Sequence, residues 1–119
     1  MLSNIELKKK VEKITNKLQA GLLDEVILDS KILLKKAQHP VVFNMLSLAF
    51  QKKGEFDNSV KIMQEALLLY PRNVLHLNNI GISYHNLEEF IEAEKHFQRG
   101  LELEPNYICL LYTSPSPRD

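Results

Sequence analysis

The sequence has one cysteine, no net charge and no long apolar run, and each of these shortages excludes a class of protein. Cys109 has no second cysteine to pair with, so the chain forms no internal disulfide and no cysteine-based metal cluster. Fifteen basic residues balance fifteen acidic ones, which leaves no overall field to attract nucleic acid or an anionic membrane. The longest apolar run, residues 41–50, is about half of the ~20 residues of a membrane span. We therefore expect a cytoplasmic protein with no nucleic-acid partner and no membrane partner.

Residues that carry chemistry are also sparse. The four glycines are spread along the chain, so no glycine-rich loop is available to hold a phosphate. The four histidines never stand in the HxxxH or HExxH spacing of a helical zinc site, and we expect them to be exposed on loops and helices. Acidic pairs such as Glu88 and Glu89 are expected on polar faces, with no apolar pocket to raise a carboxylate pKa. We therefore predict no catalytic, cofactor-binding or metal-binding residues in this segment.

What the sequence does contain is an internal repeat. Pro105 lies 34 residues after Pro71, and the same offset places large residues on large ones and small residues on small ones. The matched pairs are Phe43 and Leu77, Leu46 and Ile80, Ser47 and Gly81, Phe50 and Tyr84, Phe56 and Phe90, Ser59 and Ala93, Met63 and Phe97, Ala66 and Gly100, and Leu67 and Leu101.

Each repeat has the pattern of two helices joined by a turn. Apolar residues between Phe56 and Tyr70 recur at steps of three and four, which is typical of one face of an amphipathic helix. Gly54 is expected to adopt the left-handed conformation that ends the first helix. At the equivalent turn of the next repeat Glu88 replaces glycine, and we predict that Asn86 supplies the left-handed residue instead. The two prolines are expected to stop the second helices.

This pattern resembles the tetratricopeptide repeat, a helix-turn-helix unit of about 34 residues. Residues 40–73 and 74–107 match two such units, and residues 1–39 match a degenerate helix pair displaced by one residue. The resemblance implies an all-α fold, a right-handed α-solenoid of antiparallel helix pairs with about 2.5 to 3 repeats. The first helix has a thin apolar stripe and many lysines, as expected of a pair that caps the N-terminal end.

The last eleven residues, CLLYTSPSPRD, resemble at every position the translation of a transposase adapter used to prepare sequencing libraries. We therefore interpret residues 108–119 as a non-native tail and the remainder as a gene fragment. The alternative is a natural disordered tail rich in serine and proline, with proline-directed phosphorylation sites. If a downstream neighbour is missing, we expect marginal stability or self-association through the uncapped C-terminal repeat.

The resemblance also implies a protein-binding or peptide-binding function, because the first helices of stacked pairs line a concave surface that holds the ligand. Once the core positions are assigned, the remaining residues of these helices become candidates for that groove. They are Asn44, Leu48, Gln51, Lys52, Asn78, Asn79, Ile82 and His85. An asparagine side chain both donates and accepts, so it can hold the backbone of an extended peptide. Asn79 resembles one rung of the asparagine ladder in O-linked N-acetylglucosamine transferase repeats. An asparagine that is merely common in the family at this position, without a role in binding, explains it equally well.

Two further hypotheses remain open at this level. The chain is alternatively the N-terminal arm of a longer bacterial glycosyltransferase or sulfotransferase, in which the repeats present a polypeptide to a catalytic domain. It is a complete small adaptor if the tail is natural. Charge is also uneven: residues 1–20 carry five lysines against two glutamates, and residues 86–105 carry six glutamates against two basic residues. We interpret the basic end as a solvated cap rather than as a docking site for an acidic partner or RNA.

Overall fold

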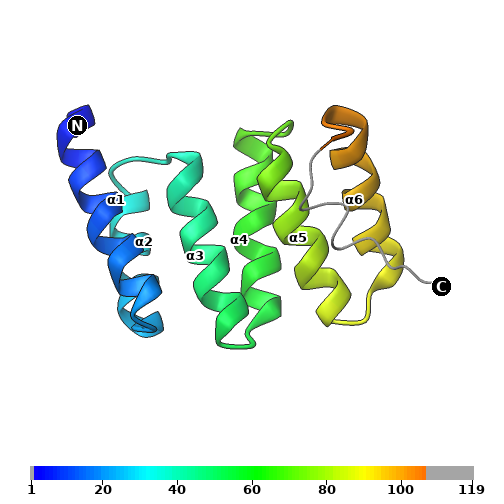
Figure 1. The fold of residues 1–119 in the computed structure, drawn as a ribbon, viewed down its shortest axis with the longest axis horizontal. Helices are drawn as coiled ribbons and strands as arrows, with labels where there is room; N and C mark the ends of the chain where they lie inside the picture. The colour runs from blue at the N-terminus through cyan, green and yellow to red at the C-terminus, as the bar shows by residue number, and fades with distance from the viewer. Residues whose placement is uncertain (1, 107–119) are drawn as a thin grey trace.

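The computed structural model describes residues 2–106, which fold into six α-helices and, over that range, contain no strand. The helices are α1 (Asn4–Gln19), α2 (Leu23–Leu34), α3 (Pro40–Lys52), α4 (Phe56–Leu69), α5 (Val74–Asn86) and α6 (Phe90–Leu103). They form three antiparallel pairs that follow one another from α1 at one end of the array to α6 at the other (Figure 1). This confirms the predicted all-α solenoid of helix pairs. The predicted tail, residues 108–119, lies outside the described residues, and the predicted repeat boundaries stay predictions.

Local sequence accounts for the helix ends. Ser3 and Glu6 form a reciprocal capping box at the start of α1, and the hydrogen bonds from the Ser3 backbone and hydroxyl lower the pKa of Glu6. Asn73 caps α5 by accepting a hydrogen bond from the backbone N–H of His76 at 2.9 Å. Helices α4 and α6 each end two residues before a proline, which confirms that these prolines stop the second helices.

The turn between α5 and α6 differs from the prediction. Gly54 has φ +78°, as expected, but the left-handed residue of the later turn is Glu88, with φ +63°. Asn86 remains the last residue of α5, so the prediction that it makes the turn was wrong. The reason is register: Glu88 lies 34 residues after Gly54, and both turns close with the same pair of backbone hydrogen bonds. The hydrogen-bonding pattern of the repeat fixes which residue must be left-handed, even though glutamate pays a steric penalty there.

The core is divided between the junctions of the three pairs. Between the first and second pairs it is mostly apolar, with Val42, Met45 and Ala49 of α3 buried against Ile14 and other residues of α1 and α2, and the Thr15 hydroxyl donates to the sulfur of Met45. Between the second and third pairs it includes Phe43, Met63 and Ile80. The third pair closes around Phe97, whose ring lies against Gly81.

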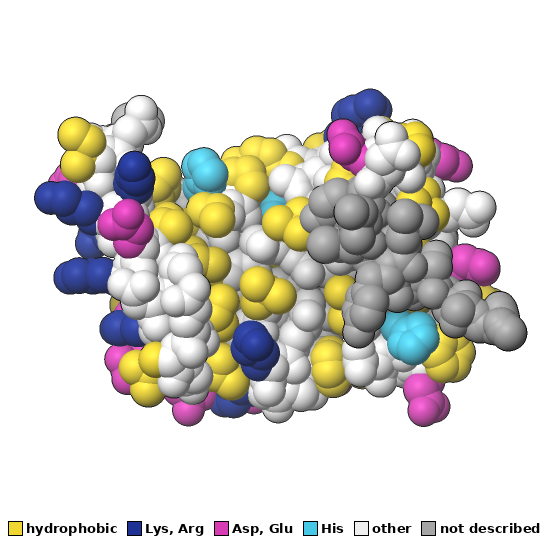
Figure 2. Space-filling model, viewed as in Figure 1, with side chains coloured by type: hydrophobic (Ala, Val, Ile, Leu, Met, Phe, Trp, Pro, Cys, Tyr) yellow, Lys and Arg dark blue, Asp and Glu magenta, His cyan; other side chains and the backbone are white. Residues whose placement is uncertain are grey.

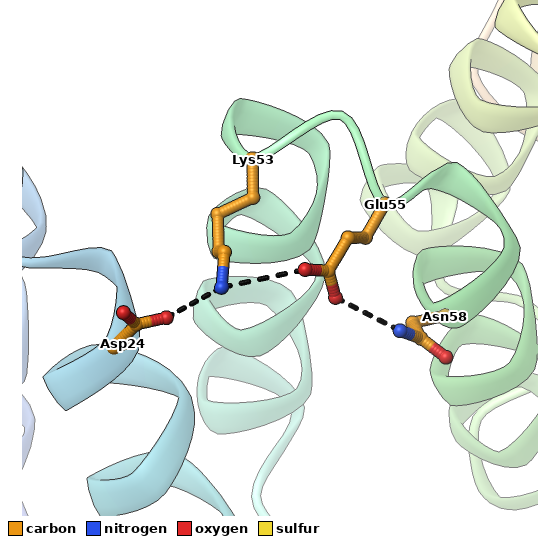
Figure 3. Close-up of polar contacts among 4 residues, drawn as sticks. All are labelled: Asp24, Lys53, Glu55 and Asn58. Carbon is orange, nitrogen blue, oxygen red and sulfur yellow. Dashed lines mark hydrogen bonds and ion pairs between the residues drawn. The ribbon is translucent and has the colours of Figure 1, made fainter.

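An exposed polar chain ties the turns at one edge of the array together (Figure 3). Lys53 lies 2.5 Å from a carboxylate oxygen of Asp24 and 3.3 Å from one of Glu55, and these two contacts raise the pKa of Lys53. Asn58 donates to Glu55 at 2.9 Å, and that bond, followed by the contact with Lys53, lowers the pKa of Glu55. These polar contacts link the start of α2, the end of α3 and the start of α4, although solvent screening keeps their contribution to stability small.

Candidate binding face

The first helices of the three pairs form a common surface, which we call the inner face. The backbone of α1 lies close to that of α3, and the backbone of α3 close to that of α5, whereas within residues 2–106 the backbones of successive second helices do not approach as closely. The pairs are therefore closer together on the side of α1, α3 and α5, and the array curves toward that side. All eight residues predicted to line the groove belong to α3 or α5.

Six of these eight residues are accessible to solvent. Lys52 and His85 are exposed, and Asn44, Leu48, Gln51 and Ile82 are partly exposed. The face thus offers two aliphatic side chains, two amides, a lysine and a histidine, and none of the eight residues is acidic. Whether they bind a ligand stays a prediction.

The sequence had suggested that the other two predicted residues are exposed, but the structure buries both of them. Asn78 is only 4% exposed and Asn79 only 3%. The amide of Asn79 donates to the side-chain oxygen of Asn44, so the two asparagines pair between α5 and α3 instead of both facing solvent. Burial of an amide requires such a partner. Asn44 is left with its own NH₂ group as a donor, and it is the better candidate for contact with a ligand.

A buried polar network lies directly behind the inner face, and the sequence analysis missed it. Ser59 of α4 lies 2.7 Å from Ser47 of α3 and 2.7 Å from Ser83 of α5, and all three side chains are fully buried. Gln51 donates to Ser47 at 3.2 Å and to the backbone oxygen of Asn79 at 3.4 Å. The network therefore fixes Gln51 and joins three helices. The only sequence signal was that Ser47 and Ser59 occupy positions where the repeat requires small residues.

His76 is a second buried polar group, and the expectation that the histidines are exposed was wrong for it. Its side chain is 1% exposed and packs edge-on against Phe43 and Tyr70, with ring centroids 6.3 and 6.2 Å away. Its Nε2 lies 3.0 Å from the backbone oxygen of Pro40, whereas Nδ1 is buried without a partner. Burial lowers the pKa of His76, so the ring is neutral and donates through Nε2.

The C-terminal end of the array carries an apolar hollow of about 520 Å³ between α5 and α6. Phe90, Phe97 and Leu101 line it, together with His85 and Glu94. Phe90 is 55% exposed and the neighbouring Ile91 82% exposed. Exposed apolar surface of this kind is typical of an interaction site. We call it the C-terminal hollow.

Residues 2–106 hold neither a candidate metal site nor a membrane-spanning helix. No cluster of three or more histidine, cysteine or acidic side chains in this range has the arrangement needed to hold a metal ion. None of the six helices is both long enough and apolar enough to cross a bilayer.

Comparison with known proteins identifies the repeat. Models of the tetratricopeptide repeat match residues 41–73 and 75–107, which together make up more than half of the chain. The peroxisomal targeting signal receptor of Saccharomyces cerevisiae is 30% identical over 73 residues, a stretch that covers 61% of this chain and 12% of the receptor. The chain therefore spans only about an eighth of the length of that curated relative.

Solved structures share the fold. The first tetratricopeptide domain of human RPAP3 aligns with a TM-score of 0.82 and 23% identity, covering 87% of this chain and 82% of that one. The corresponding domain of Spaghetti (RPAP3), solved with the HSP90 peptide SRMEEVD, aligns with a TM-score of 0.85 and 21% identity, covering 93% and 89%. With two matched repeats and this architecture, the chain belongs to the tetratricopeptide-repeat family.

Proposed function

We propose that the chain binds an extended segment of another protein along the inner face and performs no catalysis itself. The observation that carries this proposal is the arrangement around Asn44. Its amide is fixed by Asn79, and the partly exposed Leu48 lies one turn further along α3. An immobilised amide loses little side-chain entropy on binding, so it is a favourable partner for a peptide backbone. The neighbour solved with the peptide SRMEEVD supports the proposal.

The charges of the inner face favour neutral or acidic segments. Lys52 and His85 are exposed there, and none of the eight candidate residues is acidic. An acidic ligand would gain from Lys52 without meeting a carboxylate among these residues. Zero net charge, and the absence of phenylalanine, tyrosine and tryptophan among the eight candidate residues, support a protein rather than a nucleic acid as the partner.

The test uses the fluorescein-labelled peptide SRMEEVD, with binding measured by fluorescence anisotropy. We expect Lys52→Glu to weaken binding about tenfold and Asn44→Ala to weaken it by a similar factor. Lys61→Glu is the matched control, because Lys61 is exposed on α4 and the change in net charge is the same. Equal losses from Lys52→Glu and Lys61→Glu, or no saturable binding by the native chain, would show that the inner face is not the site.

We also propose that copies of the chain associate through the C-terminal hollow, because Phe90 and Ile91 expose apolar surface beside it. The average mass in sedimentation velocity should then rise with protein concentration. Phe90→Ser should reduce this rise, and Leu68→Ser should not, since Leu68 is 84% exposed but lies on α4 outside the hollow. A native chain that stays monomeric at about 0.3 mM would exclude the association. The hypothesis of an enzyme arm stays a prediction.

A further inference from the structure

The N-terminal end of the array carries a second hollow, of about 240 Å³, between α1 and α2. Its base is apolar: Ile14 and Leu33 are each 3% exposed, and Ile32 is 48% exposed. Its rim is mainly basic, with Lys10, Lys13 and Lys17 on α1 and Lys36 in the turn that follows α2, and Asp29 of α2 also lines the hollow. We call this site the basic hollow. Figure 2 shows lysine side chains gathered over this end of the molecule.

The lysines of the rim differ in how far their charges are compensated. Lys17 lies 2.7 Å from Asp29 and 3.2 Å from Glu25, and these contacts raise its pKa. Lys10 acts on Glu6, whose pKa it helps to lower after the larger effect of the Ser3 hydrogen bonds. Lys13 and Lys36 make no ion pair with any residue in the range 2–106. Asp29, the acidic residue of the lining, is paired with Lys17, so the basic hollow presents two lysines without an ion pair, Lys13 on α1 and Lys36 just after α2, around an apolar base.

We propose that the basic hollow binds a short segment of a partner protein in which an apolar side chain stands between carboxylates. The apolar side chain covers Ile32 at the base, and the flanking carboxylates pair with Lys13 and Lys36. The volume suits one or two side chains, and no aromatic residue lines the hollow for a base to stack on, so an acidic peptide fits better than RNA. The lysines surround a concavity instead of spreading over a flat surface, which favours a side chain over a membrane.

This site is separate from the inner face. The eight inner-face candidates lie on α3 and α5, whereas the basic hollow is lined by residues of α1, of α2 and of the turn that follows α2. A partner with two suitably spaced segments could engage both surfaces, and the second contact would then form at the high effective concentration of a tethered ligand. The sequence analysis interpreted the lysines of residues 1–20 as a solvated cap. In the structure, three of them line one side of the basic hollow.

The probe is the pentapeptide EELEE, blocked at both ends and labelled with fluorescein, with QQLQQ as its neutral counterpart. The double variant K13E/K36E should weaken binding of EELEE about tenfold, and QQLQQ should bind weakly to every variant. The matched control is K8E/K9E, which makes the same charge change on α1 at two exposed lysines outside the hollow, and should change the affinity less than about threefold. All four substituted side chains are exposed, so circular dichroism should show unchanged helix content.

A second pair of variants tests the apolar half of the site. Ile32→Ser should weaken binding of EELEE, whereas Leu28→Ser should not, because Leu28 is 59% exposed on the same helix but does not line the hollow. Asn44→Ala should leave this binding unchanged, so failure at the inner face and failure here are distinguishable.

Several outcomes would overturn the proposal. Equal losses from K13E/K36E and K8E/K9E would mean a general charge effect. Binding of a single-stranded RNA 12-mer or of phosphatidylserine vesicles, with the same dependence on Lys13 and Lys36 and with no binding of EELEE, would assign the hollow to another class of ligand. Loss of self-association in K13E/K36E, without binding of EELEE, would make a second copy of the chain the occupant.

Discussion

Gly81 provides the sharpest test of how the third helix pair is packed. A Cβ atom built on Gly81 would lie 2.5 Å from Cε1 of the Phe97 ring, 2.7 Å from Cδ1 and 2.8 Å from Cζ. These distances are far inside van der Waals contact, so Gly81→Ala forces the ring to move. Phe97 is 6% exposed and also lines the C-terminal hollow, which is the direction in which it can yield.

Two opposing effects set the size of the change. Alanine in place of glycine inside a helix stabilises the folded chain by about 1 kcal/mol, through backbone entropy and helix propensity. Forcing an extra methyl group into a packed contact costs about 1 to 3 kcal/mol. We therefore expect Gly81→Ala to destabilise the chain by about 0 to 2 kcal/mol. Gly81→Leu should lie at the upper end of the overpacking range, because α5 and α6 must separate to admit it.

The decisive measurement is a double-mutant cycle with Phe97→Val, followed by urea unfolding monitored by circular dichroism at 222 nm. Valine removes the ring atoms that would clash. Gly81→Ala should then change sign and stabilise the Phe97→Val background by about 0.5 to 1 kcal/mol. Glu89→Leu, at an exposed position in the adjacent turn, should stay within about 0.5 kcal/mol of neutral. The same destabilisation by Gly81→Ala in both backgrounds would refute the contact with Phe97.

Three other predictions concern strained and buried groups. Glu88→Gly should stabilise the chain by about 1 kcal/mol in urea unfolding, because the residue has a positive φ. Ser59→Ala should cost about 1 to 3 kcal/mol by leaving Ser83 without its acceptor and Ser47 with only the hydrogen bond from Gln51, while replacing all three serines by alanine should cost less than the single change. Because the pKa of His76 is lowered in the folded chain, the unfolded chain takes up a proton at a higher pH than the folded chain does. The free energy of unfolding is therefore highest above pH 6.5 and falls as the pH drops below 6.5. Urea unfolding at about pH 7.5 and 5.5 should show this loss in the native chain and less of it in His76→Leu.

The 34-residue offset predicted much of this packing without coordinates. It pairs Gly81 with Ser47 and Phe97 with Met63. The third helix pair therefore has the larger residue on its second helix, Phe97, and the smaller residue on its first helix, Gly81. The clash between Gly81 and a larger side chain follows from that exchange. The prolines likewise predicted where α4 and α6 end, because a residue before proline is disfavoured in a helix.

The sequence could not predict which polar residues are buried with partners and which face a ligand. Asn79 and His76 lie 34 residues after Met45 and Val42, both of which are buried, and this correspondence was the available signal. Polarity misled the prediction, because an amide or an imidazole suggests an exposed position until its partner is located. The basic hollow was unpredictable for a related reason: Lys36 joins Lys13 only after α2 has folded back on α1.

The same offset shows that the two junctions of the solenoid are built differently. Val42, Met45 and Ala49 of α3 bury apolar surface against the first pair, while the equivalent residues of α5 are His76, Asn79 and Ser83. Each of these three polar residues bonds to the second pair, at Pro40, Asn44 and Ser59 respectively.

An apolar contact tolerates small shifts, whereas these three hydrogen bonds hold only in one register, and breaking one leaves a buried polar group unpaired. The second junction therefore fixes the relative position of α3 and α5, the helices that carry every inner-face candidate. Because His76 is one of the three, acid should loosen this junction before it loosens the first. Hydrogen exchange at about pH 5.5 should then show α5 and α6 opening at lower free energy than α2 and α3. Earlier opening of α2 and α3 would mean that the apolar junction is the weaker one.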